Sequence, residues 1–209
     1  MAEKAGCIDA CLYYAGRGKF ENVKAARLAR TKLYLTNQAA YFNQLIKEIV
    51  ALEKRAAKLG LKPLVRLNGT SDIRWENIHF VYNNVTYRNI FELFPDIQFM
   101  DYTKIPNRDN SMNGISKFPA NYDLTFSYSG KPGFEKYNQR AIDKGMRIAA
   151  VFDKVESIPL TFHKRQVLSG DDNDLTFTKP KNSILALYAK GFKKEIQLGL
   201  NSQFIIRGA

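Results

Sequence analysis

Four aspartates stand just after segments that have the pattern of short buried strands: Asp72, Asp101, Asp153 and Asp172. In a parallel α/β sheet the working groups lie just past the carboxyl ends of the strands, so we expect these carboxylates on one rim. Carboxylate oxygens are ligands that Mg²⁺ accepts, and two such ions can activate water against a phosphodiester. Aspartate also caps helices and builds turns, so the same four residues fit a purely structural role.

Lysine and small polar residues occupy equivalent positions after the strands. A lysine at a strand end can bind phosphate or stabilise developing negative charge. In an enzyme of this kind the catalytic groups would be Asp72, Asp101, Lys104 and Asp172, and the substrate-binding groups would be Asn68, Ser127 and Lys190. Whether the chain is an enzyme stays open, because it contains neither a Gly-x-Ser-x-Gly elbow nor a Gly-x-x-x-x-Gly-Lys-[Ser/Thr] phosphate loop.

The two cysteines, Cys7 and Cys11, are four residues apart, so their thiols share a face if the segment is helical. A Cys-x-x-x-Cys-x-x-Cys motif holds the cluster of radical S-adenosylmethionine enzymes, but Tyr14 occupies the third position here. Two cysteines are too few for a four-thiolate iron–sulfur cluster. We therefore predict that both cysteines are buried free thiols. The alternative is that the protein is a degenerate relative of a cysteine-cluster enzyme.

Basic residues are concentrated near the N-terminus of a chain whose formal net charge is +12. Residues 1–66 contain 13 basic and 5 acidic residues, a net charge of +8. The densest basic patch consists of Arg17, Lys19, Lys24, Arg27 and Arg30. Such a patch is typical of a polyanion binder, and a nearby aromatic residue such as Tyr14 can stack on a base. The alternative is that the charge serves only solubility.

The N-terminal third must be helical for these residues to share a surface. Residues 21–34 and 42–59 have apolar side chains at helical spacing, Thr36 or Asn37 can cap the second helix, and Gly60 can end it. Lys47, Lys54 and Lys58 then fall on the face opposite the apolar stripe.

After Pro63 the sequence pattern changes from helical spacing to short strand-like runs. Strand patterns occur at six places: 64–67, 97–100, 122–127, 147–152, 166–168 and 184–188. Helical patterns at 87–94 and 134–144 separate some of them, which favours βα units and a parallel sheet. We predict a single α/β domain with a mostly parallel sheet of about six strands, either open or a partial barrel. A basic helical part (1–62) precedes the βα core (63–191), and a C-terminal extension (192–209) follows it.

Long motifs in four places carry a family resemblance. They are Gly6 to Gly18, Val65 to Glu76, Phe99 to Lys104, and Asn121 to Ser127. Together they resemble the uncharacterised gene product 88 proteins of bacteriophages and prophages. The resemblance implies a phage origin, a location in the host cytoplasm and an α/β fold. In those relatives a Cys-Pro pair stands just before the segment that matches residues 1–4, and this sequence lacks the pair, which leaves any cofactor unknown.

Three functional hypotheses follow in order of preference. The first is a nucleic-acid-binding protein whose basic N-terminal helices contact phosphates. The second is an enzyme with a polar site on the rim of the sheet, with Mg²⁺ as one possible cofactor. The third is a non-catalytic structural or host-interaction protein. No apolar run approaches the ~18 residues that span a bilayer, and residues 1–4 lack the apolar core of a signal peptide, so we expect no membrane partner and a cytoplasmic location.

Overall fold

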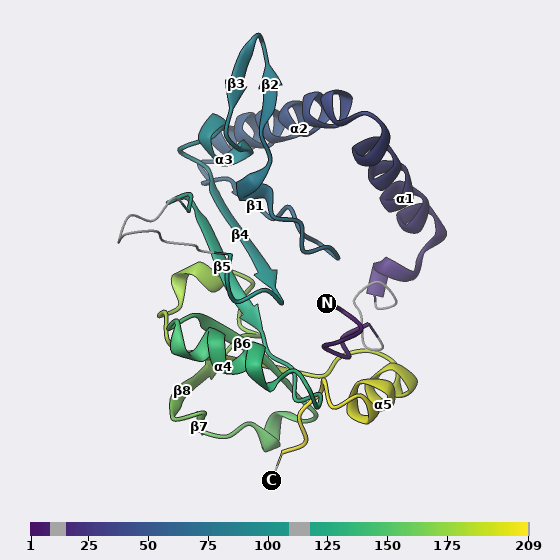
Figure 1. Ribbon diagram of the computed structural model, residues 1–209, viewed down its shortest axis with the longest axis vertical. Coiled ribbons are helices and arrows are strands. Elements are labelled where there is room, and N and C mark those ends of the chain that lie inside the picture. The colour runs from purple at the N-terminus through teal and green to yellow at the C-terminus, as the bar shows by residue number, and fades with distance from the viewer. Residues whose placement is uncertain (9–15, 109–117, 209) are drawn as a thin grey trace.

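The computed structural model describes residues 1–8, 16–108 and 118–208. Its centre is an open sheet of seven strands in the order β1-β4-β5-β6-β9-β8-β7 (Figure 1). The strands are β1 Leu64–Val65, β4 Gln98–Thr103, β5 Tyr122–Ser127, β6 Arg147–Phe152, β7 Thr161–Phe162, β8 Arg165–Ser169 and β9 Ile184–Tyr188. All neighbours are parallel except β7 and β8. The prediction of a mostly parallel, open α/β sheet in one domain is confirmed.

The middle strands form because their side chains are apolar on both faces. Five of the six residues of β6 are buried, including Ile148 and Phe152. A near-continuous apolar run is typical of a parallel strand that is covered on both sides. The six predicted strand positions all coincide with strands of this sheet, and the short antiparallel β7 is an addition that the sequence pattern did not reveal.

The N-terminal helices are α1, Glu21–Thr36, and α2, Gln38–Lys58, preceded by a short 3₁₀ helix η1, Gly16–Lys19. Asn37 caps α2 as predicted, because its side chain accepts a hydrogen bond from the backbone N–H of Ala40 at 3.0 Å. Gly60 follows the end of α2 with φ +64°, a left-handed conformation that glycine adopts without strain. Phe42, Ile46 and Ile49 point from α2 into the core.

Between β1 and β4 along the chain, the structure contains a β-hairpin where the sequence pattern indicated no strand. It consists of β2, Phe80–Tyr82, and β3, Val85–Tyr87. Asn83 and Asn84 connect them with φ values of 49° and 61°, as a type I′ turn requires. The helix predicted over 87–94 is therefore wrong at its start, because Tyr87 pairs in the hairpin and the helix α3 covers only Ile90–Leu93.

The C-terminal half adds α4, Glu135–Asp143, and α5, Lys193–Asn201, with the 3₁₀ turns η3, Val155–Ser157, and η4, Thr176–Thr178. A further 3₁₀ turn, η2, Trp75–Asn77, follows β1. After α5 the chain returns to the sheet, where Ile206 forms a parallel bridge with Phe152 of β6. Among the described helices none is both long enough and apolar enough to span a membrane.

The buried side chains form two clusters that divide the sheet. One cluster packs α2, the hairpin and α3 on β1 and β4, and includes Phe42, Trp75 and Phe99. The other packs α4 on β5, β6 and β9, and includes Phe126 and Phe134. In Figure 1, α1 continues from α2 and stands apart from the sheet, while the N-terminus and α5 lie on the side toward which β4 points.

Candidate functional site

Helix α1 carries three residues of the predicted basic patch and buries no side chain. Lys24 and Arg27 are half-buried, and Arg30 is exposed. Two of its three leucines, Leu28 and Leu35, are 71% and 73% exposed. Lys24 donates to Glu21 at 2.7 Å. The helix therefore turns two of its cations partly toward the protein and two of its three leucines toward solvent, unlike a helix held by an apolar face.

The C-terminal end of α1 is its anchor to the core. Tyr34 contacts Tyr41 of α2 and Trp75 edge-on, with ring centroids 5.3 and 5.7 Å apart. At the other end, the Lys19 ammonium lies 4.4 Å from the centre of the Phe192 ring, which joins η1 to the start of α5. The predicted stacking residue Tyr14 and the cysteine Cys11 lie outside the described residues, as does the side chain of Arg17.

Helix α2 presents a stripe of exposed lysines. Lys47, Lys54 and Lys58 are all exposed and lie outside the buried apolar stripe, and Lys47 and Lys54 lie on the flank of α2 that borders the β2–β3 hairpin. Within the described part of the chain, no carboxylate lies within ion-pair distance of these three lysines. Lys58 also sits in the last turn, where a cation is favoured by the helix dipole. The stripe extends the basic surface of the N-terminal part well beyond the patch that the sequence singled out.

At the carboxyl ends of β1, β4 and β5, the structure brings together four residues that were predicted from their positions after strands. They are Asn68, Asp72, Asp101 and Lys104. Asn68 and Asp101 form the first pair: the Asn68 backbone N–H donates to Asp101 Oδ1 at 2.8 Å, and Asn68 Nδ2 donates to Oδ2 at 3.2 Å. The Tyr122 hydroxyl also donates to Oδ2, at 2.8 Å. The Asn68 side-chain oxygen accepts from Trp75 Nε1 at 3.1 Å. Both carboxylate oxygens of Asp101 are therefore engaged.

Asp72 is engaged in the same way by a residue that the sequence did not single out. Arg108 Nη1 donates to Asp72 Oδ1 at 2.9 Å, and Arg108 Nη2 donates to Glu76 Oε2 at 2.6 Å. The Arg108 side chain is fully buried and that of Glu76 is 4% exposed. Thr103 Oγ1 and the backbone N–H of Lys104 donate to the two oxygens of Asp72. We call the connected set Asn68, Asp72, Glu76, Asp101, Arg108 and Tyr122 the rim network.

Burial shifts two titrations at this rim. It raises the pKa of Asp101 to about 6, against the lowering effect of the Asn68 and Tyr122 hydrogen bonds. It lowers the pKa of Lys104 to about 8, although nearby Cys7 and Asp72 favour the charged form. Lys104 Nζ donates to the carbonyls of Ser127 and Tyr128 at 2.8 and 3.1 Å. The lysine thus ties β4 to the end of β5.

The N-terminal segment is packed on the same rim. Ala5 is fully buried, and its carbonyl accepts from Ser129 Oγ at 2.6 Å. Gly6 has φ +66°, and a Cβ there would come within 2.9 Å of Ser202, so the turn requires glycine. Cys7 is partly buried, and its thiol lies 3.6 Å from the carbonyl of Ala2. Ala5 and Gly6 therefore pack against the core around the sheet, while residues 1–4 and Ile8 are exposed.

The other predicted rim residues lie apart from the rim network, because β6, β9 and β8 occupy the other half of the sheet. Asp153 accepts from Ser157 Oγ at 2.6 Å, exposed Asp172 pairs with Lys179 at 3.1 Å, and Lys190 pairs with Asp171 at 2.5 Å. No three His, Cys, Asp or Glu side chains gather as a metal site within residues 1–8, 16–108 and 118–208. The aspartates predicted as one constellation are thus divided between two places.

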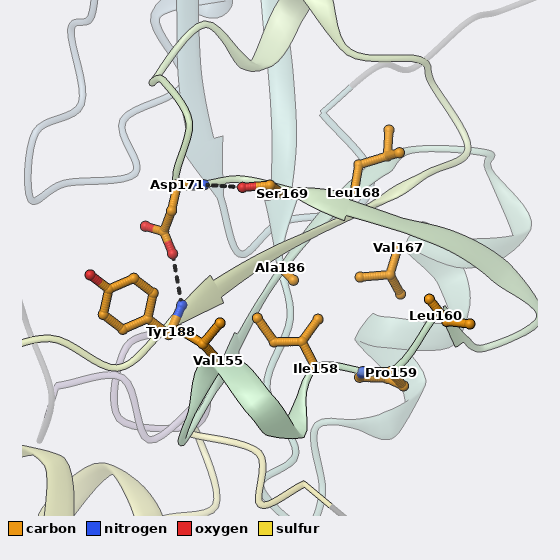
Figure 2. Close-up of a pocket in the computed structure, with 10 residues that line it drawn as sticks. All are labelled: Val155, Ile158, Pro159, Leu160, Val167, Leu168, Ser169, Asp171, Ala186 and Tyr188. Atoms are coloured by element: carbon orange, nitrogen blue, oxygen red, sulfur yellow. Dashed lines mark hydrogen bonds between the residues drawn. The ribbon is translucent and has the colours of Figure 1, made fainter.

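An apolar cavity of about 350 Å³ opens beside β8 and β9 (Figure 2). The segment between β6 and β7 lines one side of the cavity with Val155, Ile158, Pro159 and Leu160. The strands line the other side with Val167 of β8 and Ala186 of β9. Asp171 stands at one end and accepts from the backbone N–H of Tyr188 at 2.9 Å. Because Asp171 also holds Lys190, that predicted substrate-binding lysine belongs to the surroundings of this cavity and not to the rim network.

The family model described as Gene product 88 matches residues 1–208. Neither the curated proteins nor the solved structures contain a significant match to this chain.

Proposed function

The chain belongs to the gene product 88 family, as its motifs indicated, and we propose that it binds nucleic acid through its basic N-terminal helical part. One observation carries the proposal. Six exposed basic side chains of α1 and α2 have no carboxylate within ion-pair distance among the described residues. They are Arg30, Lys32, Lys47, Lys54, Arg55 and Lys58. Unpaired cations gathered on one part of a molecule create a field that attracts and holds a polyanion.

The predicted patch keeps its place in this proposal. Lys19 and Arg30 are exposed and can reach phosphates directly, whereas Lys24 and Arg27 are half-buried and contribute mainly through the field of the helix. Arg17 and Tyr14 belong to the same hypothesis, although Tyr14 and the side chain of Arg17 lie outside the described residues. Its setting would be the host cytoplasm, where a phage protein meets nucleic acid.

The hydrogen bonds of the rim network favour a structural role for Asp72 and Asp101 over metal-assisted chemistry. A carboxylate that holds Mg²⁺ needs an oxygen directed at the ion. Asp101 and Asp72 direct their oxygens at Asn68, Tyr122, Thr103 and Arg108 instead. These hydrogen bonds give the aspartates a structural role, namely to fix the loops after β1 and β4.

The proposal is tested by fluorescence anisotropy with labelled single-stranded DNA, duplex DNA and RNA across a salt series, with Mg²⁺ and with EDTA. Each phosphate contact contributes about 0.7–0.9 to the slope of log K against log salt. We expect Lys19→Gln with Arg30→Gln to lower the slope by about 1.4–1.8. The matched control removes two exposed lysines elsewhere, Lys136 of α4 and Lys181 before β9, and should leave the slope unchanged.

Absence of salt-sensitive binding to all three nucleic acids would refute the proposal. Equal effects of the two double variants would show that net charge, and not the basic helices, holds the ligand. Cleavage that requires Mg²⁺ would favour the enzyme hypothesis.

A further inference from the structure

A groove runs between α2 and the β2–β3 hairpin, with a volume of about 240 Å³. Its floor is apolar, formed by buried Ile46 and half-buried Val50, and exposed Ala51 also lines it. Lys47 and Lys54 line it from the helix, and Tyr82 lines it from the hairpin. The two lysines are seven residues apart, so they stand about 10 Å apart along the helix axis. The groove therefore combines an apolar surface, an aromatic ring and two cations.

Tyr82 is half-buried and packs against the apolar cluster that joins α2 to the hairpin. Phe80, two residues before Tyr82 on β2, stacks on Phe42 of α2 with ring centroids 4.4 Å apart and on Tyr87 at 5.5 Å. The Asn83–Asn84 turn closes the ribbon in a conformation that suits its twist. A ring held in this way loses little conformational freedom when a ligand stacks on it.

The chemistry of this groove matches a single-stranded nucleic acid. Proteins that bind single strands combine aromatic rings, on which bases stack, with cations that follow the backbone. Bases in a duplex are already stacked and cannot lie flat on a side chain without leaving the helix. A base has an apolar face that suits the floor of the groove, while the phosphates on either side meet Lys47 and Lys54.

We propose that the groove between α2 and the β2–β3 hairpin binds one unstacked base of a single-stranded nucleic acid, with Tyr82 as the stacking partner and Lys47 and Lys54 on the flanking phosphates. This inference rests on the proposed function and gives it a place and a strand preference. It also extends the binding surface from the predicted patch around α1 to the flank of α2 that borders the hairpin.

The experiment uses the full chain and a single-stranded oligonucleotide that contains 2-aminopurine, whose fluorescence falls when the base stacks. We expect quenching with the unchanged protein and tighter binding of the single strand than of the same sequence as a duplex. Tyr82→Ala should abolish the quenching and weaken binding about 5- to 140-fold, from the usual worth of one base stacked on an aromatic side chain. Tyr82→Phe, which keeps the ring, should restore the quenching.

Lys47→Gln with Lys54→Gln provides a variant that cannot fail through lost packing, because both side chains are exposed. It should lower the salt slope for single strands by about 1.4, whereas the Lys136→Gln and Lys181→Gln control should not. The inference would be overturned if the protein bound nucleic acid in a salt-sensitive way but neither groove variant changed that binding, or if the protein bound the duplex more tightly. The proposed function would stand in both cases. No binding to any nucleic acid would overturn the proposed function itself.

Discussion

Replacement of Arg108 by methionine tests the energetics of the rim network most directly. The Arg108 side chain is fully buried and makes hydrogen bonds to Glu76, Asp72, the Ile73 carbonyl and the Tyr122 hydroxyl. Methionine fills much of the same space but leaves the Glu76 carboxylate, which is 4% exposed, without its partner. Removal of one partner from a buried ion pair costs about 3–5 kcal/mol, because the remaining charge stays out of water.

That loss is large against the whole stability of a domain, which is about 5–15 kcal/mol. For a chain of this length it corresponds to a fall in melting temperature of roughly 6–20 °C. The assay is urea unfolding followed by fluorescence of Trp75, the one tryptophan in the chain. Trp75 is 2% exposed and donates its indole N–H to Asn68, so its emission reports on the rim network itself.

Two further variants make the test specific. Arg88→Met removes an arginine whose side chain is 78% exposed and whose partner is Glu92, and we expect little change in the unfolding midpoint. Glu76→Gln added to Arg108→Met should recover part of the lost stability, because it removes the stranded charge. A loss below about 1 kcal/mol for Arg108→Met would refute the reasoning, because it would place this network within the range of surface ion pairs.

Two other predictions concern Asp101 and the hairpin. The pKa of Asp101 is raised in the folded protein to about 6, so the folded state binds more protons than the unfolded state between about pH 4 and 6. The free energy of unfolding should therefore fall by about 2–3 kcal/mol as the pH rises through this window, because Asp101 loses its proton less readily in the folded state. In the Asp101→Asn variant, the free energy of unfolding measured with urea should not show this fall. Asn84 has φ +61°, so Asn84→Val should destabilise the protein by about 1–2 kcal/mol, whereas Asn84→Gly should not; equal unfolding midpoints for the two variants would contradict the turn assignment.

Local sequence patterns predicted the strands and the long helices because each of these elements has its own periodicity. The apolar stripe from Phe42 to Leu59 indicates a helix whatever surrounds it, and the run from Arg147 to Phe152 indicates a buried strand. The hairpin escaped detection because Val81 and Val85 are exposed and the ribbon is only three residues long on each side. The Asn-Asn pair at its turn was the signal that could have indicated it.

The predicted site residues show which contacts local sequence patterns can predict and which they cannot. The rule for parallel strands placed Asn68, Asp72, Asp101 and Lys104 at the carboxyl ends of neighbouring strands, and the structure does bring them together. It did not indicate Arg108, which follows the end of β4 by five residues and holds Asp72 and Glu76. Nor did it separate Asp172 and Lys190 from the others, because that separation depends on which strands are neighbours.

The sequence by itself determined the basic N-terminal helices, the positions of the main strands and the family, since composition, periodicity and motifs are properties of short stretches of chain. Only the tertiary structure decided the strand order, the groove beside Tyr82 and the bonding of the rim aspartates. Arg108 and Asp72 are 36 residues apart, and Asn68 and Asp101 are 33 apart. A carboxylate becomes a structural anchor or an open ligand according to the donors that reach it, and those donors arrive from distant segments only when the sheet has formed.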